Sequence, residues 1–147
     1  MKKISFVLIA LLALVAFTGC PTAHDDYDYA ANPIVTCLAG GGNGWPITFT
    51  QTPSAEGAIS TIEWTWDGSQ NWEESEAGTV QFAVLAADGV WDGKWCSGVT
   101  VTVGGGYATS GQNGVNNVFS GLVADTDYVI TILAGFDGTV KIKIDEA

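Results

Sequence analysis

The sequence has no arginine, one histidine and one methionine, and its five lysines stand against sixteen carboxylates. The formal net charge is therefore −11. A chain this acidic cannot neutralise phosphates, which excludes nucleic acid as a partner. The shortage of histidine removes the nucleophilic triads, because no local base is evident for a serine or cysteine. At 147 residues the chain has room for about one domain core.

The N-terminal segment has the features of an export signal. Lys2 and Lys3 precede an apolar run over residues 4–17, which ends at Gly19-Cys20. The run is shorter than the roughly 20 residues that span a bilayer, so we expect a signal peptide over residues 1–19. The ending resembles the lipobox of bacterial lipoproteins, although Phe17 stands where leucine is usual. The resemblance implies cleavage before Cys20 and its acylation, including palmitate, which would attach the chain to a membrane. The alternative is an ordinary signal peptide with a coincidental cysteine.

Cleavage would leave three lysines against sixteen carboxylates, a charge of −13. By resemblance to lipoprotein sorting, Pro21 in place of an aspartate permits export to an outer membrane. We therefore expect a lipoprotein at the outer membrane or cell surface. Residues 20–33 are acidic and poor in aliphatic side chains, and we interpret them as the lipidated cysteine and a tether. A metal site at His24 is the alternative for this stretch, but a solvated tether is favoured and no metal is predicted.

Residues 34–147 show no helical periodicity of useful length. Short runs of β-branched and aromatic residues alternate with clusters of Gly, Asn, Asp and Ser. The pattern predicts an all-β domain, an antiparallel immunoglobulin-like β-sandwich of seven or eight strands. Residues 136–139 are expected to form a tight hairpin turn between the last two strands. The expected strands cover residues 34–38, 47–50, 59–66, 79–85, 99–103, 118–119, 127–133 and 140–144.

Two cysteines remain if Cys20 carries lipid. Cys37 lies on the first expected strand and Cys96 follows a tryptophan-rich loop. An even pair in an exported protein favours a disulfide, which would stabilise the fold by about 4 kcal/mol in the chain-entropy model. The alternative is two free buried thiols.

The six tryptophans are the most informative feature. Trp64 shares one face of an alternating strand with Ile62 and Trp66, and we place it in the core. Other tryptophans lie in loops rich in Gly and Asp, which run over protein surfaces. Exposed rings can stack on the apolar faces of sugars, while polar side chains bond the hydroxyls. The alternative is that these rings pack back onto the ends of the sandwich. The loop tryptophans are Trp45, Trp72, Trp91 and Trp95.

The order of motifs resembles a known family. Gly44-Trp45 follows the first strand, GTVQFAVL forms residues 78–85, and Trp91-Asp92-Gly93-Lys94-Trp95 comes next. A glycine run, residues 113–117 and a strand beginning near Tyr128 complete the series. Over residues 34–144 the chain resembles the starch-binding β-sandwich domains of SusE/SusF-type surface lipoproteins and related carbohydrate-binding modules. The resemblance implies glycan binding without catalysis. It points to Trp45, Trp91, Lys94 and Trp95 as ligand contacts.

Two departures from that family bear on affinity. Its members usually carry several domains in tandem, and a single module lacks avidity. Their sites also often use further basic residues, whereas Lys94 is the only one near these aromatics.

We expect no enzymatic activity, no catalytic residues and no cofactor. Asp88 and Asp92 belong to the carboxylates that could in principle hydrolyse glycosides or hold calcium. A small sandwich offers little cleft for hydrolysis, and no ordered calcium loop is recognisable. The expected ligand is a neutral polysaccharide or oligosaccharide, with other surface lipoproteins as possible partners. The alternative function is a structural or protein-interaction lipoprotein with no glycan ligand.

Overall fold

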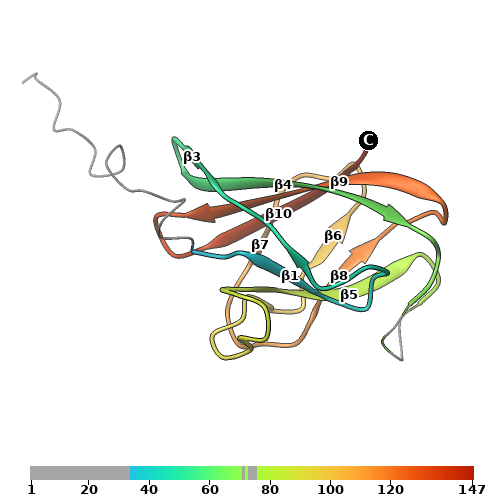
Figure 1. The fold of residues 1–147 in the computed structure, drawn as a ribbon, viewed down its shortest axis with the longest axis horizontal. Coiled ribbons are helices and arrows are strands. Elements are labelled where there is room, and N and C mark those ends of the chain that lie inside the picture. The colour runs from blue at the N-terminus through green and yellow to red at the C-terminus, as the bar shows by residue number, and fades with distance from the viewer. Residues whose placement is uncertain (1–33, 71, 73–75) are drawn as a thin grey trace, which may run out of the picture.

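The computed structural model describes residues 34–70, 72 and 76–147, which form two packed five-stranded sheets. The first sheet has the order β2-β1-β5-β8-β6 and the second β3-β4-β9-β10-β7. Figure 1 shows β4, β9 and β10 in one layer above β1, β5 and β8. The strands are β1 (Cys37–Gly40), β2 (Ile47–Thr48), β3 (Thr52–Ser54), β4 (Gly57–Trp66), β5 (Thr79–Leu85), β6 (Thr100–Thr102), β7 (Ala108–Ser110), β8 (Asn117–Ser120), β9 (Thr126–Gly135) and β10 (Val140–Glu146).

The all-β sandwich is confirmed, but the number of strands was underestimated. The described part of the chain contains ten strands, and the two that the pattern misses, β3 and β7, have three residues each. Segments this short carry too little alternation to be recognised from sequence. The sheets are antiparallel as expected, except for one parallel pair, β6 with β8. The signal peptide (residues 1–19), Cys20 and the tether to residue 33 lie outside the described residues.

The core follows the two-residue period of the longest strands. On β4, Trp64 and Trp66 are buried while Glu63 and Thr65 point outward. Trp64 therefore lies in the core, as predicted. Hydrophobic residues at alternate positions of a strand face one side of a sheet, so each of the two sheets presents one apolar surface to the other. No helix in the described part of the chain has the length and apolar character needed to cross a membrane.

The predicted hairpin turn joins β9 to β10. The carboxylate of Asp137 accepts hydrogen bonds from the backbone N–H of Thr139 at 3.0 Å and from its hydroxyl at 2.7 Å. These bonds to Thr139 lower the pKa of Asp137. Gly138 has φ +78°, in the left-handed region where glycine is favoured. The turn thus sets the register in which Val140 pairs with Ala134.

The predicted disulfide is not formed, because Cys37 and Cys96 are free buried thiols. Cys37 pairs with Leu85 on one edge of β5, whereas the bridge from Trp95 to Val84 places the next residue, Cys96, at the other edge. Two strand spacings amount to about 9–10 Å, beyond the limit of about 7 Å between the Cα atoms of a disulfide. Cys96 instead donates its thiol proton to the carbonyl of Gly114 at 3.0 Å.

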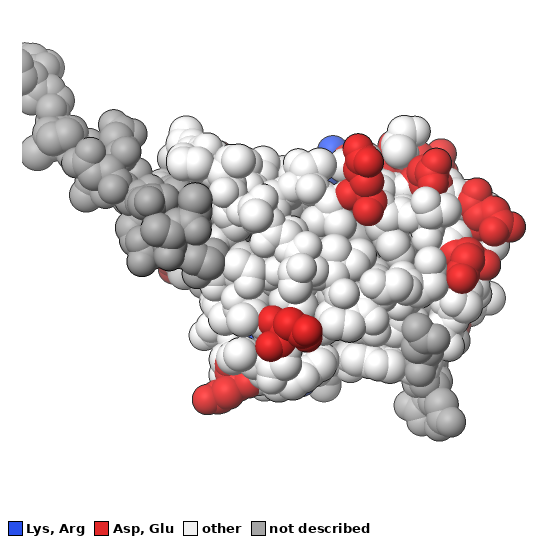
Figure 2. Space-filling view, viewed as in Figure 1, with Lys and Arg blue, Asp and Glu red and all other residues white. Residues whose placement is uncertain are grey.

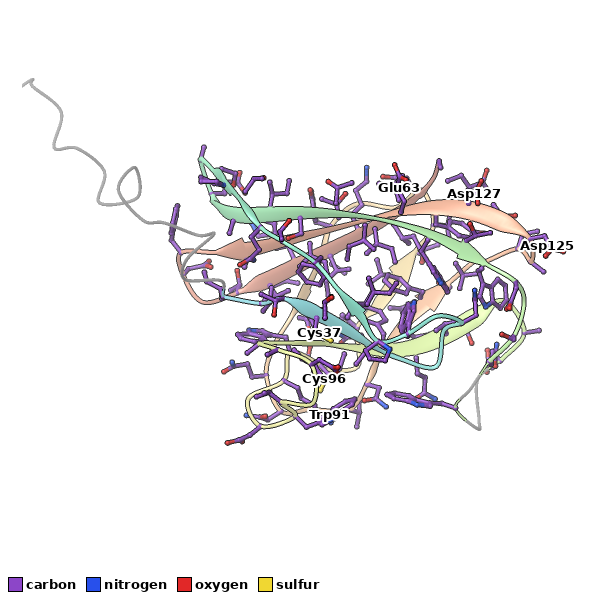
Figure 3. The ribbon with its side chains drawn as sticks, viewed as in Figure 1. Cys37, Glu63, Trp91, Cys96, Asp125 and Asp127 are labelled. Carbon is purple, nitrogen blue, oxygen red and sulfur yellow. The ribbon has the colours of Figure 1, made fainter. Side chains whose placement is uncertain are left out.

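The acidic groups are unevenly distributed. Most of those visible in Figure 2 lie toward one end of the sandwich, where Figure 3 labels Glu63, Asp125 and Asp127. On the second sheet and its margin, Lys141 pairs with Glu56 at 3.6 Å and Lys143 with Asp145 at 2.7 Å. Two of the three lysines in the described part of the chain are therefore engaged by carboxylates.

Candidate functional site

Three loops meet beside β1 and form a groove of about 380 Å³. The loop between β1 and β2 contributes Trp45 and Pro46, the loop between β4 and β5 contributes Trp72, and the loop after β5 contributes Asp88 and Trp91. Figure 3 shows Trp91 on the side of the first sheet that faces away from the second. The described lining residues are Ala39, Gly40, Trp45, Pro46, Trp72, Asp88 and Trp91.

Two tryptophans from different loops form the aromatic surface of the groove. The ring centroids of Trp72 and Trp91 are 6.2 Å apart, and their planes are inclined at 39°. Trp91 is 44% exposed and Trp72 is half-buried. Pairs of inclined indole rings present a continuous apolar surface with polar N–H groups at its margin. A surface of this kind is suited to stacking against a flat apolar face.

The ammonium group of Lys94 lies 5.7 Å from the centre of the Trp91 ring. This is within the distance at which a cation is attracted to the π face of an indole. The loop that carries both residues is held at its end by Trp95 and Val84, whose backbones exchange hydrogen bonds of 2.8 and 3.1 Å. Trp91 is therefore positioned by the sheet at one end of its loop and by a contact within the loop.

Trp45 forms the floor of the groove, whereas Trp72 and Trp91 form its aromatic surface. Its ring packs 5.1 Å from that of Trp64 and 6.3 Å from that of Phe119, which places it at the margin of the core. A Cβ atom at Gly42 would come within 2.6 Å of the Trp45 ring, so the close approach requires glycine. The indole N–H of Trp45 is buried without a hydrogen-bond partner among the described residues.

The structure separates Trp95 from the other predicted contacts. Trp95 is half-buried and packs against the core, and it is not among the described residues that line the groove. Its bridge to Val84 directs the ring to the core side of the sheet, because Val84 also faces the core. The structure thus brings Trp45, Trp91 and Lys94 together but leaves Trp95 aside.

Sequence reasoning did not select Trp72, Pro46 or Asp88 as ligand contacts. Trp72 was recognised as a loop tryptophan in a polar stretch, a signal that by itself says nothing of its neighbours. Its contact with Trp91 joins two separate loops, and no local spacing predicts such a contact. Asp88 is exposed. Burial, and to a smaller degree the negative charge of Asp88, raises the pKa of Cys37.

A second loop supplies polar groups next to the aromatic ones. The backbone N–H of Asn113 donates to the carbonyl of Lys94 at 2.9 Å, and the side chain of Gln112 donates to the carbonyl of Gly93 at 3.2 Å. Nearby on the outward face of β5, Asn116 donates to the side-chain carbonyl of Gln81 at 3.2 Å. Amide groups of this kind can bond hydroxyls at the margin of an aromatic surface.

The described residues contain no group of three or more His, Cys, Asp or Glu side chains placed to hold a metal ion. No protein-family model, curated protein or solved structure matches this chain.

Proposed function

We propose that this chain is a surface-anchored, non-catalytic carbohydrate-binding lipoprotein. Its ligand is a neutral glycan, such as a starch-like glucan, held by tryptophan stacking. The observation that carries the proposal is the inclined pair Trp72 and Trp91, both of which line the groove. The predicted contacts Trp45 and Lys94 lie at the same place, one in the floor and one on the Trp91 ring.

The chemistry around the rings suits a neutral polar ligand. Asp88 offers acceptors and Lys94 offers donors, so sugar hydroxyls can be bonded in either sense. Their opposite charges leave the site without a strong preference for an ion. Asp88 is the only carboxylate among the described lining residues, whereas glycoside hydrolysis normally uses two. These features support binding without catalysis.

The anchoring part of the proposal depends on the lipobox-like sequence at Cys20. Acylation at this residue would hold the domain at the outer membrane or cell surface through an acidic tether, where other surface lipoproteins could act beside it. Radioactive palmitate should label the wild-type chain but not the Cys20→Ser variant, and the variant should leave the membrane fraction. Equal labelling of the two chains would contradict this part.

The proposal extends to an immunoglobulin-like topology. Tyr128 lies near the start of β9, and its hydroxyl accepts the backbone N–H of Val123 at 2.7 Å. Immunoglobulin-like sandwiches commonly tie a tyrosine near the start of a late strand to the backbone a few residues upstream. This tyrosine supports the finer assignment of the sandwich.

Affinity electrophoresis tests the proposal directly. The chain should be retarded in gels that contain starch, glycogen, xylan or peptidoglycan, and the retarding glycan should quench tryptophan fluorescence. The Trp91→Ala variant should be retarded much less than the wild-type chain. Unchanged mobility and fluorescence with all four glycans would refute carbohydrate binding.

One observation favours the alternative, a protein-interaction lipoprotein. Val90, next to Trp91, is 43% exposed, so an exposed aliphatic side chain adjoins the aromatic surface of Trp72 and Trp91. Protein interfaces are rich in such aromatic and aliphatic surfaces. This alternative replaces the first proposal if the chain binds none of the glycans but binds another surface lipoprotein, and if Val90→Ser weakens that binding.

A further inference from the structure

Gly41 lies under Trp72. Gly41 follows β1, is buried, and donates its backbone N–H to the carbonyl of Gln81 at 3.0 Å, so β5 holds its backbone in place. A Cβ atom at residue 41 would come within 3.2 Å of both the Cβ and the backbone nitrogen of Trp72. Contacts this short are tighter than ordinary van der Waals packing, so even an alanine would displace Trp72 by a few tenths of an ångström. Trp72 can therefore approach the backbone of residue 41 this closely because that residue has no side chain.

The other ring of the pair is held independently. Trp91 belongs to the loop that ends in the paired backbones of Trp95 and Val84, on the opposite edge of β5 from β1. If Trp72 moves relative to Gly41 and β1, Trp91 does not have to move with it. The separation of the two rings is consequently set by how closely Trp72 approaches Gly41.

That separation is too small to hold a sugar between the rings. Carbon atoms in contact are about 3.5–4.0 Å apart, so a sugar ring with an indole on each side needs about 7–8 Å between them. The centroids of Trp72 and Trp91 are 6.2 Å apart. A ligand must instead lie across both rings, and a single sugar covers one of them.

We infer that Gly41 is a positioning residue that sets the gap between Trp72 and Trp91, and that this gap selects chains of two or more sugars over a single sugar. The inference rests on the proposed glycan-binding function. Each ring then contacts a different sugar of the same chain, and the two contacts reinforce each other because the second costs little further immobilisation.

A length series tests the selection. The full chain is titrated, by tryptophan fluorescence and calorimetry, with glucose, maltose, maltotriose and maltohexaose, and in parallel with xylose and its oligomers. We expect maltotriose to bind at least about tenfold more tightly than glucose, the gain of one added stacking contact. Trp72→Ala should remove most of that difference. If a single sugar binds within about threefold of its trimer, the inference fails while glycan binding stands; if no sugar of either series binds, the proposed function fails with it.

A matched pair of glycine variants tests the positioning role. Gly41→Ala should lower the affinity for maltotriose about threefold or more, because moving Trp72 by a few tenths of an ångström uses most of the positional tolerance of a binding site, about 0.5 Å. It should also change the circular-dichroism couplet that arises from the coupled indoles of Trp72 and Trp91. Loss of this couplet in Trp91→Phe would assign it to the pair. Gly106→Ala is the control, because its Cβ would meet no atom within 4 Å. A Gly41→Ala chain that keeps both couplet and affinity would overturn the positioning role.

Trp72→Phe provides a second test in case Gly41→Ala does not fold. Trp72→Phe retains a stacking ring but widens the gap to Trp91 without touching β1. It should reduce the preference for maltotriose over glucose, whereas Tyr107→Phe, at an exposed residue that is not among the groove's described lining residues, should not. An unchanged length preference in Trp72→Phe would show that the gap does not select the ligand.

Discussion

The rings of Trp72 and Trp91 stand 6.2 Å apart and 39° from parallel, although they belong to loops on either side of β5. Their contact lies outside the core, whose tightest aromatic pair is Phe82 stacked on Phe119 at 3.9 Å. Changes to the loop rings should therefore alter binding, and changes to the core should alter stability.

Trp91→Ala should weaken glycan binding about tenfold, the value of one aromatic stacking contact. Because Trp91 is 44% exposed, the free energy of unfolding should change by only about 0.5–1 kcal/mol, including the lost contact with Lys94. Calorimetric titration and urea unfolding measure the two effects. Tyr107→Ala is the control, since Tyr107 is similarly exposed at 46% and is not among the groove's described lining residues. Equal losses of affinity in both variants would contradict a specific role for Trp91.

Ionic strength should have little effect on binding. A neutral glycan carries no charge for salt to screen, so its affinity should change by less than about twofold between low and high salt. An anionic or cationic ligand would lose affinity steeply over the same range. Titrations of the best-binding glycan at two salt concentrations decide this, and a strong dependence would contradict a neutral ligand.

Tyr128→Phe should destabilise the domain without changing the groove. The phenol hydroxyl accepts the backbone N–H of Val123 at 2.7 Å, and its loss leaves a donor without that partner. The expected cost is about 1–3 kcal/mol in urea unfolding, with glycan affinity unchanged. Tyr107→Phe, which removes an exposed hydroxyl, should cost far less. Equal costs for both variants would show that the bond to Val123 contributes little.

Both core cysteines should be present as thiols that react slowly. Burial and the charge of Asp88 raise the pKa of Cys37, which lowers the amount of reactive thiolate at neutral pH. A thiol reagent applied to the Cys20→Ser chain should label neither cysteine in the native state and both in denaturant without reductant. Asp88→Asn should lower the pKa of Cys37 and speed its labelling. Failure to label either residue in denaturant would indicate the disulfide that the structure does not contain.

The β9–β10 turn should weaken in acid. Hydrogen bonds from Thr139 depress the pKa of Asp137 below its ordinary value of 3.8, so the carboxylate stabilises the fold above that pH. This contribution is lost as the pH falls through the depressed pKa. The thermal midpoint of the wild type should therefore fall more than that of Asp137→Asn on acidification below about pH 4. Parallel falls in the two proteins would show that Asp137 is not responsible.

Alternation predicted the long strands well and the short ones poorly. Residues 59–66 and 140–144 were assigned because apolar residues recur at every second position, and they lie within β4 and β10. The pattern predicts the first strand at residues 34–38, but it lies at Cys37–Gly40, because the glycines at its end supply no side-chain pattern. Those glycines matter structurally, since Gly40 and Gly42 leave the space that the ring of Trp45 fills.

The candidate site was predicted only in part, for the same physical reason. Trp91 and Lys94 are neighbours in sequence, and their cation–π contact lies within one loop. Trp72 was missed as a ligand contact because its partner lies on another loop. Trp95 resembles Trp91 in local sequence, but its pairing with Val84 turns it toward the core.

The all-β class, the burial of Trp64, the final hairpin and the acidic charge follow from the sequence, because each depends on composition or on side chains a few residues apart. Which loop tryptophans meet, and the separation of Cys37 from Cys96, depend on tertiary packing. Both outcomes depend on the order of strands around β5, which places residues distant in sequence along one or the other edge of that strand. Strand order results from the packing of the whole sandwich, and no local pattern encodes it.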